Sequence, residues 1–237
     1  MIQTEGIFVG GSAISAPIIG EDFNWTGGDG TYQVLDDGGG NWRIKFLSSG
    51  TFTPLKNMVI DAFLVGGGGG SGSSYCGAGG AGYTTTVRSV VLTANTAYSI
   101  VVGAAGTNGN PSSAGGETTA FTASAAGGKN TSNGTSSSKR PGGAGGSGGA
   151  GYVSPVATTT GGTDGGDGTS SATTGGKGQG TTTREFGEAD GTLYASGGGS
   201  NLTATVSNSG NGGRNGITSI APADGIVVIR QHKEVAA

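Results

Sequence analysis

Residues 142–151 constrain the fold more than any other stretch, because they repeat with a period of three. They read Gly-Gly-Ala-Gly-Gly-Ser-Gly-Gly-Ala-Gly. This period matches neither an α-helix, with about 3.6 residues per turn, nor a β-strand, with two. It matches a polyproline-II-type helix, which has three residues per turn and no internal hydrogen bonds. Since backbone N–H and C=O groups need partners, we expect such helices to lie side by side and bond to one another.

Within this stretch, each Gly-Gly-x triplet would leave two bare edges for neighbouring helices. The side chains of Ala144, Ser147 and Ala150 would then form the third, outward edge. Such an edge is small and neutral, so we expect a scaffold here, or a surface that another layer covers, and not a binding surface. The expected scaffold glycines are Gly142, Gly143, Gly145, Gly146, Gly148 and Gly149.

The composition favours a fold held by its backbone. Glycine accounts for 55 of 237 residues, whereas charged residues make up 11%, less than half of the usual ~25%. A net charge of −3 without a basic run argues against nucleic-acid binding. No apolar stretch approaches the ~18 residues of a membrane span, so we expect no membrane insertion. The first basic residue is Arg43, so we expect no signal peptide, which begins with positive charge.

Apolar residues concentrate at both ends of the glycine-rich region and predict β-strands there. Residues 31–35 and 42–46 are predicted to form a hairpin with a long loop, because 36–40 are rich in turn formers. Residues 59–65 and 226–229 are continuously apolar and are expected to pair in one sheet. Further strands are predicted at 7–9, 83–92, 98–103 and 118–125, and a hairpin at 185–194.

These patterns divide the chain into three parts. Residues 1–65 form an N-terminal β region, 66–224 a polyglycine-II region with inserted strands, and 225–237 a closing strand with a polar tail. No stretch has helical periodicity, so we expect an all-β protein with almost no α-helix. A disordered polyglycine linker is the alternative. The alternation of glycine tracts with polar inserts favours an ordered array.

The chemistry-bearing residues do not indicate a catalytic site. His232 is the single histidine, and no partner near it in the sequence suggests a Ser-His-Asp triad. Glu185, Glu188 and Asp190 are expected to be solvated charges of the 185–194 hairpin, not a glycosidase pair. Cys76 is alone, so we expect a half-buried thiol. We therefore expect no enzyme, no metal and no cofactor.

The polar inserts between the glycine tracts are the candidate binding elements. Loops on a rigid scaffold commonly carry recognition. Ser/Thr/Asn-rich loops with a few Tyr and aliphatic anchors suit contact with carbohydrate or protein. The alternative is that each insert is only a turn. The inserts are 129–141, 152–160, 169–174 and 200–209, and the candidate receptor contacts are Lys139, Arg140, Tyr152, Val156, Leu202 and Val206.

Several segments together resemble the glycine-rich domain proteins of phages and prophages, and the resemblance covers roughly residues 32–230. In that group, the distal adhesins of T-even-like phage long tail fibres carry a polyglycine-II sandwich whose tip loops bind the host receptor. The glycine-rich domain of the anaplastic lymphoma kinase receptor is similar, with polyglycine helices inserted into a jelly-roll-like sheet. The segments that carry the resemblance are 42–46, 50–53, 59–70, 98–103, 180–187 and 225–230.

The resemblance implies a jelly-roll-like β-sandwich with a polyglycine-II sandwich inserted between its strands. It also implies a non-enzymatic phage or prophage tail adhesin, located in the virion tail or outside the cell. The expected partners are a bacterial surface glycan or outer protein, other tail proteins and a possible homo-oligomer. Two alternatives remain: a self-assembling fibre or tube subunit, because exposed edges can add neighbours, and an ice-binding slab.

Overall fold

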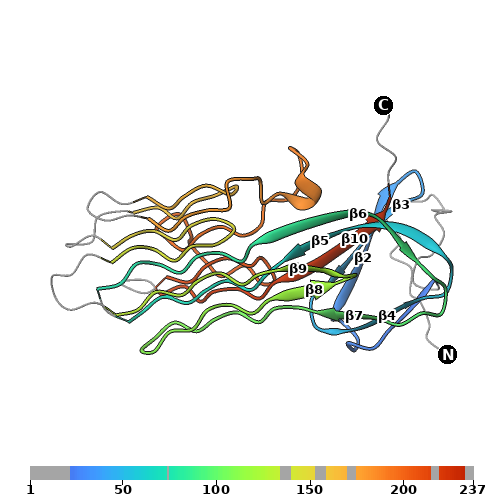
Figure 1. The fold of residues 1–237 in the computed structure, drawn as a ribbon, viewed down its shortest axis with the longest axis horizontal. Helices are drawn as coiled ribbons and strands as arrows, with labels where there is room; N and C mark the ends of the chain where they lie inside the picture. The colour runs from blue at the N-terminus through green and yellow to red at the C-terminus, as the bar shows by residue number, and fades with distance from the viewer. Residues whose placement is uncertain are drawn as a thin grey trace, which may run out of the picture.

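The fold is described from a computed structural model, for residues 22–73, 75–133, 140–152, 159–169, 175–214 and 219–232. The molecule is elongated, with the β-strands gathered at one end and long glycine-rich segments extending from them (Figure 1). The described residues contain ten strands and one 3-10 turn, η2 (Glu185–Gly187), and no α-helix. The expectation of an all-β protein with almost no α-helix is confirmed.

The strands form two five-stranded sheets in which every neighbouring pair is antiparallel. The first sheet, in spatial order, contains β1 (Phe23–Trp25), β4 (Gly50–Pro54), β7 (Tyr98–Val101), β8 (Thr118–Ala120) and β9 (Ala123–Ala125). The second sheet contains β2 (Tyr32–Gly38), β3 (Asn41–Phe46), β10 (Ile226–Gln231), β5 (Met58–Val65) and β6 (Thr84–Leu92).

The main hydrophobic core lies between the two sheets. Along β5, Ile60, Ala62 and Leu64 alternate toward this core and are fully buried. Phe52 of β4 approaches from the first sheet, and its ring centroid lies 5.5 Å from that of Phe46. Two layers with a shared apolar interior make a β-sandwich. The predicted pairing of 59–65 with 226–229 is confirmed, since β10 lies between β5 and β3.

The predicted hairpin of β2 and β3 is confirmed, but the expectation of a long loop between the two strands is wrong. Strand β2 continues through an irregularity to Gly38, and β3 begins at Asn41. Gly39 and Gly40 alone form the turn, with φ of +62° and +80°. Two successive positive φ values define the two-residue turn that suits the twist of a hairpin.

The predicted strand 118–125 is in fact a second hairpin, β8–β9. Phe121 and Thr122 turn the chain, with φ of +50° and +64°. Aromatic and β-branched residues rarely adopt positive φ, so nothing in the sequence indicated a turn. The ring of Phe121 enters the main core, 6.3 Å from Phe52, and this burial favours the strained turn.

The glycine-rich segments form laterally bonded helices of three residues per turn. The N–H groups of residues 66–70 point in turn to three neighbouring segments. The N–H groups of residues 66 and 69 bond to segment 77–83, and those of 67 and 70 bond to segment 113–117. The N–H group of residue 68 bonds to segment 219–225. A strand would alternate between two directions, so the direction of bonding confirms a polyproline-II-type helix. The acceptors in order are Tyr83, Gly116, Ala223, Gly80 and Ser113.

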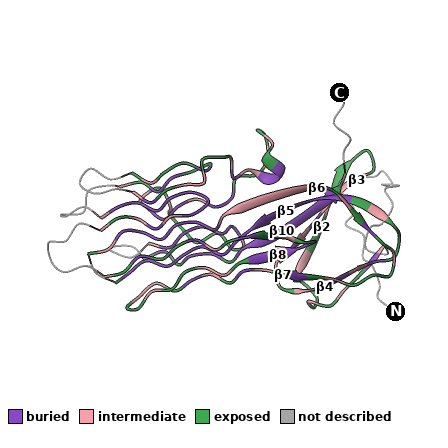
Figure 2. Ribbon diagram, in the orientation of Figure 1, coloured by how far each residue is buried: buried purple, intermediate pink, exposed green. Residues whose placement is uncertain are grey.

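The carbonyl groups of the same segment bond to three further neighbours. Carbonyls 67 and 70 accept from segment 126–131, carbonyl 68 from 103–107, and carbonyl 69 from 210–214. The segment 66–71 is therefore surrounded by six others and carries few side chains. Figure 2 shows buried residues continuing from the sheets far along these segments. The donors are Gly128, Gly106, Gly213 and Thr131.

The stretch 142–151 is two helices, not the single one expected. The chain bends over residues 145–147 and returns beside itself. Gly149 N–H donates to the Gly143 carbonyl at 2.8 Å, joining the two arms. Ser147 and Ala150 are consequently buried, at 0% and 3% exposure, and do not form an outer edge. Glycine and serine accommodate a bend as easily as a helix, so the repeat concealed the reversal.

Candidate functional site

The loops at the distal end of the glycine bundle, remote from the sheets, bring separate polar inserts together. Segment 66–71 leads away from β5 and segment 77–82 returns to β6, so the connection between them is distal (Figure 1). This connection carries Tyr75, which is 40% exposed and has a φ of +48°. The rings of Tyr75 and Tyr152 meet edge to face, with centroids 5.8 Å apart.

Two of the candidate contacts lie side by side at this aromatic pair. Tyr152 N–H donates to the Arg140 carbonyl at 2.9 Å. Sequence reasoning did not include Tyr75, because its segment is short and glycine-rich and looked like scaffold. A tyrosine inside such a segment was the available signal, since a bare lateral contact has no room for a ring.

Hydrogen bonds hold the connection that carries Tyr75. Ser73 N–H donates to Asn133 Oδ1 at 2.7 Å, and Thr131 Oγ1 donates to the Gly77 carbonyl at 2.5 Å. Cys76 Sγ donates to the Gly72 carbonyl at 2.8 Å. Burial raises the pKa of the Cys76 thiol, which disfavours a reactive thiolate. The expected half-buried thiol is confirmed.

The remaining candidate contacts do not join this pair. Leu202 lies in a turn, where its N–H donates to the Gly199 carbonyl at 3.2 Å. Val206 is 57% exposed, and its carbonyl accepts from Ser209 Oγ at 2.6 Å. Lys139 and Val156 lie outside the described residues.

Val206 belongs to the part of its insert that returns to the sandwich. The neighbouring Asn208 donates through Nδ2 to the carbonyls of Leu47 and Gly225, both at 2.9 Å. Gly225 directly precedes β10. The insert 200–209 therefore runs back along the bundle, and its two ends face different surroundings.

A buried ionic cluster lies on the outer face of the second sheet, under residues 181–195. Glu185 is 1% exposed, so the expectation of a solvated charge is wrong. Its Oε1 lies 2.6 Å from Arg43 Nη1, and its Oε2 lies 3.8 Å from Lys45 Nζ. Burial and the Glu185 carboxylate raise the pKa of Tyr194. The sequence conceals this cluster, because its partners are more than a hundred residues apart.

Aromatic rings fix the same segment to the sheet. Phe186 and Tyr194 cover Phe63, with ring centroids 6.1 Å and 5.6 Å from it. Arg230 stacks over the Phe186 ring, 4.1 Å from its centroid, and bonds Glu188 at 2.7 Å. Glu188 is thus paired as well. The predicted hairpin closes through the Glu185 N–H, which donates to the Thr192 carbonyl at 2.9 Å.

His232 has partners that its sequence neighbours did not suggest. Its Nδ1 lies 2.6 Å from Asp61 Oδ1, and its Nε2 lies 3.1 Å from Ser89 Oγ. Arg88 and Arg230 bond the other Asp61 oxygen, both at 3.2 Å. Burial of Asp61 acts to raise its pKa, but hydrogen bonds from His232, the Ser89 N–H and Arg230 outweigh burial and lower it.

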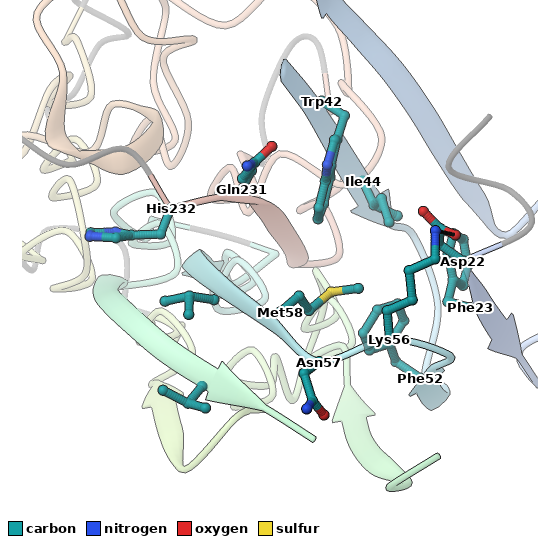
Figure 3. A pocket seen from close by; sticks show the side chains of 12 residues that line it. Asp22, Phe23, Trp42, Ile44, Phe52, Lys56, Asn57, Met58, Gln231 and His232 are labelled. Carbon is teal, nitrogen blue, oxygen red and sulfur yellow. Dashed lines mark ion pairs between the residues drawn. The ribbon is translucent and has the colours of Figure 1, made fainter. Parts of the chain in front are cut away.

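An open groove lies at the sandwich end of the molecule, and Figure 3 shows the side chains that line it. Its volume is about 710 Å³. Trp42 and Met58 project into it, whereas the imidazole of His232 lies at its rim and points away. An ion pair between Lys56 and Asp22, at 2.5 Å, borders the other side. The lining residues are Asp22, Phe23, Trp42, Ile44, Phe52, Lys56, Asn57, Met58, Val59, Val91, Gln231 and His232.

The described ranges also bear on metal binding and on membrane insertion. Among those residues, no group of three or more His, Cys, Asp and Glu side chains is arranged to hold a metal ion. The helical element of these ranges, η2, has three residues, far fewer than a membrane-spanning helix needs.

The family comparison matches most of the chain. A family model described as a glycine-rich domain matches residues 47–230. The match begins after β3 and includes the glycine segments and strands β4 to β9. No curated protein matches the chain.

Proposed function

The chain belongs to the glycine-rich domain family, and from its distal loops we propose that it is a tail-associated adhesin of a phage or prophage, in which binding requires no catalysis. In this function a polyglycine-II bundle presents polar loops to a bacterial surface. One observation carries the proposal. The rings of Tyr75 and Tyr152, from segments far apart in the sequence, meet, and the connection between segments 66–71 and 77–82 that carries Tyr75 lies at the end of the bundle remote from the sheets.

The bundle suits presentation because it forms a rigid support for the loops at its end. Each segment is bonded laterally to several others through backbone groups, which cannot change rotamer as side chains can. A support that is ordered before binding loses less conformational entropy when a receptor is bound. A rigid, side-chain-poor support therefore favours recognition at its end over recognition along its sides.

The chemistry at the tip suits a polar bacterial surface. Tyrosine offers a large contact area with only two rotatable bonds, and a hydroxyl for hydrogen bonding. Arg140, beside Tyr152, adds a cation that pairs with carboxylate or phosphate groups. A surface glycan or an outer protein fits this set. The same function places the protein in the virion tail or outside the cell, in contact with other tail proteins.

The test compares the distal tyrosines with an exposed residue at the other end. Tyr75→Ala and Tyr152→Ala are each expected to weaken binding to susceptible bacteria about 30-fold, the usual effect of a hot-spot aromatic. Val91→Ala is the control, since Val91 is 71% exposed on the sandwich. Binding is measured with labelled protein and a panel of bacterial strains.

A second variant tests the insert 200–209 separately from the Tyr75–Tyr152 pair. Replacing residues 200–209 with a Gly-Ser linker tests the contribution of Leu202 and Val206. Unchanged cell binding in both tyrosine variants, with melting temperatures near that of the wild type, would contradict the proposed tip site. Loss of binding only in the 200–209 variant would move the site to that insert.

A further inference from the structure

The sandwich end holds a serine, a histidine and a buried carboxylate in one chain of hydrogen bonds. Asp61 is 0% exposed, and its Oδ1 lies 2.6 Å from His232 Nδ1. His232 Nε2 lies 3.1 Å from Ser89 Oγ. The three residues come from β5, from β6 and from the position after β10. A nucleophile, base and carboxylate are recognised by such geometry and not by sequence order.

The direction of the hydrogen bonds follows from the carboxylate. An ionised carboxylate only accepts hydrogen bonds, and Arg88 and Arg230 keep Asp61 ionised through Oδ2. Nδ1 of His232 therefore carries the hydrogen, and in the neutral ring Nε2 is left as an acceptor. The Ser89 hydroxyl donates to that acceptor. This is the arrangement in which imidazole removes a proton from serine.

We infer that Ser89, His232 and Asp61 form a reactive serine site that accepts an acyl group from activated esters. Ser89 lies where a nucleophile is accessible, because it is exposed on β6, an edge strand of its sheet. Strand pairing is irregular opposite Asp61, and Ser89 has a φ of +56°. Strained backbone in non-glycine residues gathers at functional sites, and here it directs the hydroxyl toward His232.

The acyl group is transferred in two steps, acylation of Ser89 and hydrolysis of the acyl-serine. Ser89 Oγ attacks the ester carbonyl carbon while its proton passes to His232 Nε2. The bond to the leaving oxygen breaks, and that oxygen takes the proton from His232, leaving an acyl-serine. Water then attacks the acyl-serine, again giving a proton to Nε2. The serine oxygen recovers that proton, and a carboxylic acid is released.

The surroundings restrict the substrate to esters with good leaving groups. The Ser89 N–H already donates to Asp61 Oδ1 at 3.2 Å, so it does not stabilise a developing oxyanion. A missing oxyanion donor costs about 10²–10³ in rate. Two guanidinium groups also share the Asp61 charge, which weakens its support of a protonated imidazole. Aryl esters, whose leaving oxygen needs little stabilisation, are therefore the expected class.

The experiment labels the intact chain with a fluorophosphonate and identifies the modified residue by peptide mass spectrometry. Reaction breaks the P–F bond, joins phosphorus to Ser89 Oγ and releases fluoride with the serine proton. Ser124, an exposed serine of β9, is the internal control, since the single histidine of the chain lies beside Ser89. We expect Ser89 to be labelled at least tenfold faster than Ser124.

Variants test the base independently of the label. His232→Gln retains an amide that can donate to Asp61 but removes the base. It is expected to reduce both Ser89 labelling and p-nitrophenyl acetate hydrolysis at least tenfold. Ser89→Ala is expected to reduce the hydrolysis by at least the same factor. Equal labelling of Ser89 and Ser124 in the wild type would overturn the proposal. The hydrogen bonds among Ser89, His232 and Asp61 would then be purely structural. Undiminished labelling in a folded His232→Gln protein would do the same.

Discussion

At the scale of single residues, many glycines of the bundle are required because neighbouring backbones approach closely. A Cβ added to Gly68 would lie 1.9 Å from the Asn211 carbonyl oxygen, and one added to Gly70 would lie 1.9 Å from that of Thr107. Both obstacles are backbone atoms and cannot move aside like a side-chain tip. Neither glycine has positive φ. The requirement here is for space and not for a left-handed conformation.

The first prediction follows from this close approach. Gly68→Ala should lower the free energy of unfolding by at least about 3 kcal/mol, the upper part of the usual cost of overpacking. Gly166→Ala is the matched control, because the nearest atom to its added Cβ is 3.1 Å away. Thermal unfolding followed by circular dichroism gives both values. Equal melting temperatures for the two variants would refute the close lateral contact.

A second prediction concerns Asp61 and acid. The pKa of this carboxyl is lower in the folded protein than its ordinary value of about 3.9. The unfolded chain therefore binds a proton first, so the stabilisation is complete above about pH 4 and is lost as pH falls through the folded pKa. Urea unfolding between pH 7 and 2 should show this loss. The loss should be shallower for Asp61→Asn, and parallel curves would contradict the assignment.

At the scale of elements, residues 181–195 act as a cover for the outer face of the second sheet. Their aromatic rings bury a second core against β5 and β10. Ionic contacts surround this core, with Glu185 on Arg43 and Glu188 on Arg230. A sheet with one apolar outer patch needs such a cover, because its two faces cannot both be packed against the other sheet.

The third prediction compares the two carboxylates of this cover. Glu185→Gln should cost about 3 kcal/mol of stability, because it removes one partner of a buried ion pair. Glu188→Gln should cost less than about 1 kcal/mol, since the Glu188 side chain is 41% exposed. Both values are measured by urea unfolding at neutral pH. A larger effect at Glu188 would contradict this description of the cover.

At the scale of the whole molecule, the bundle continues the order of the second sheet. Val65 pairs with Thr84, and one residue further the Gly66 N–H donates to the Tyr83 carbonyl. On the other side, β5 pairs with β10, and the Gly68 N–H donates to the Ala223 carbonyl just before β10. The sheet therefore sets which glycine segments become neighbours, and it reduces the entropy cost of aligning them.

The fourth prediction tests this continuity by hydrogen exchange. The amides of residues 67–70 should exchange slowly, like those of β5, although they belong to no strand or α-helix. The exposed turn at Gly39 and Gly40 provides a fast-exchanging reference within the same chain. Exchange is followed by mass spectrometry after dilution into heavy water. Rates at 67–70 equal to those of the turn would favour the disordered-linker alternative.

The sequence alone determined the positions of β2, β3, β5 and β10, the lack of α-helix among the described residues and the three-residue periodicity. Each of these is a local property, since it depends on side-chain alternation or on glycine spacing. The sequence also identified Arg140 and Tyr152 as candidate contacts in the polar inserts. It could not predict the bend within 142–151, because glycine-rich chain bends and extends with equal ease.

Tertiary structure decided every pairing between distant charges and rings. Glu185 is buried only because the cover meets Arg43, and Tyr75 meets Tyr152 only because two segments of the bundle end together. His232 acquires Asp61 and Ser89 through the order of β10, β5 and β6. Such contacts depend on which segments become neighbours. In the bundle that choice follows from the order of the strands from which the segments extend, and bare glycine backbone carries little information about it.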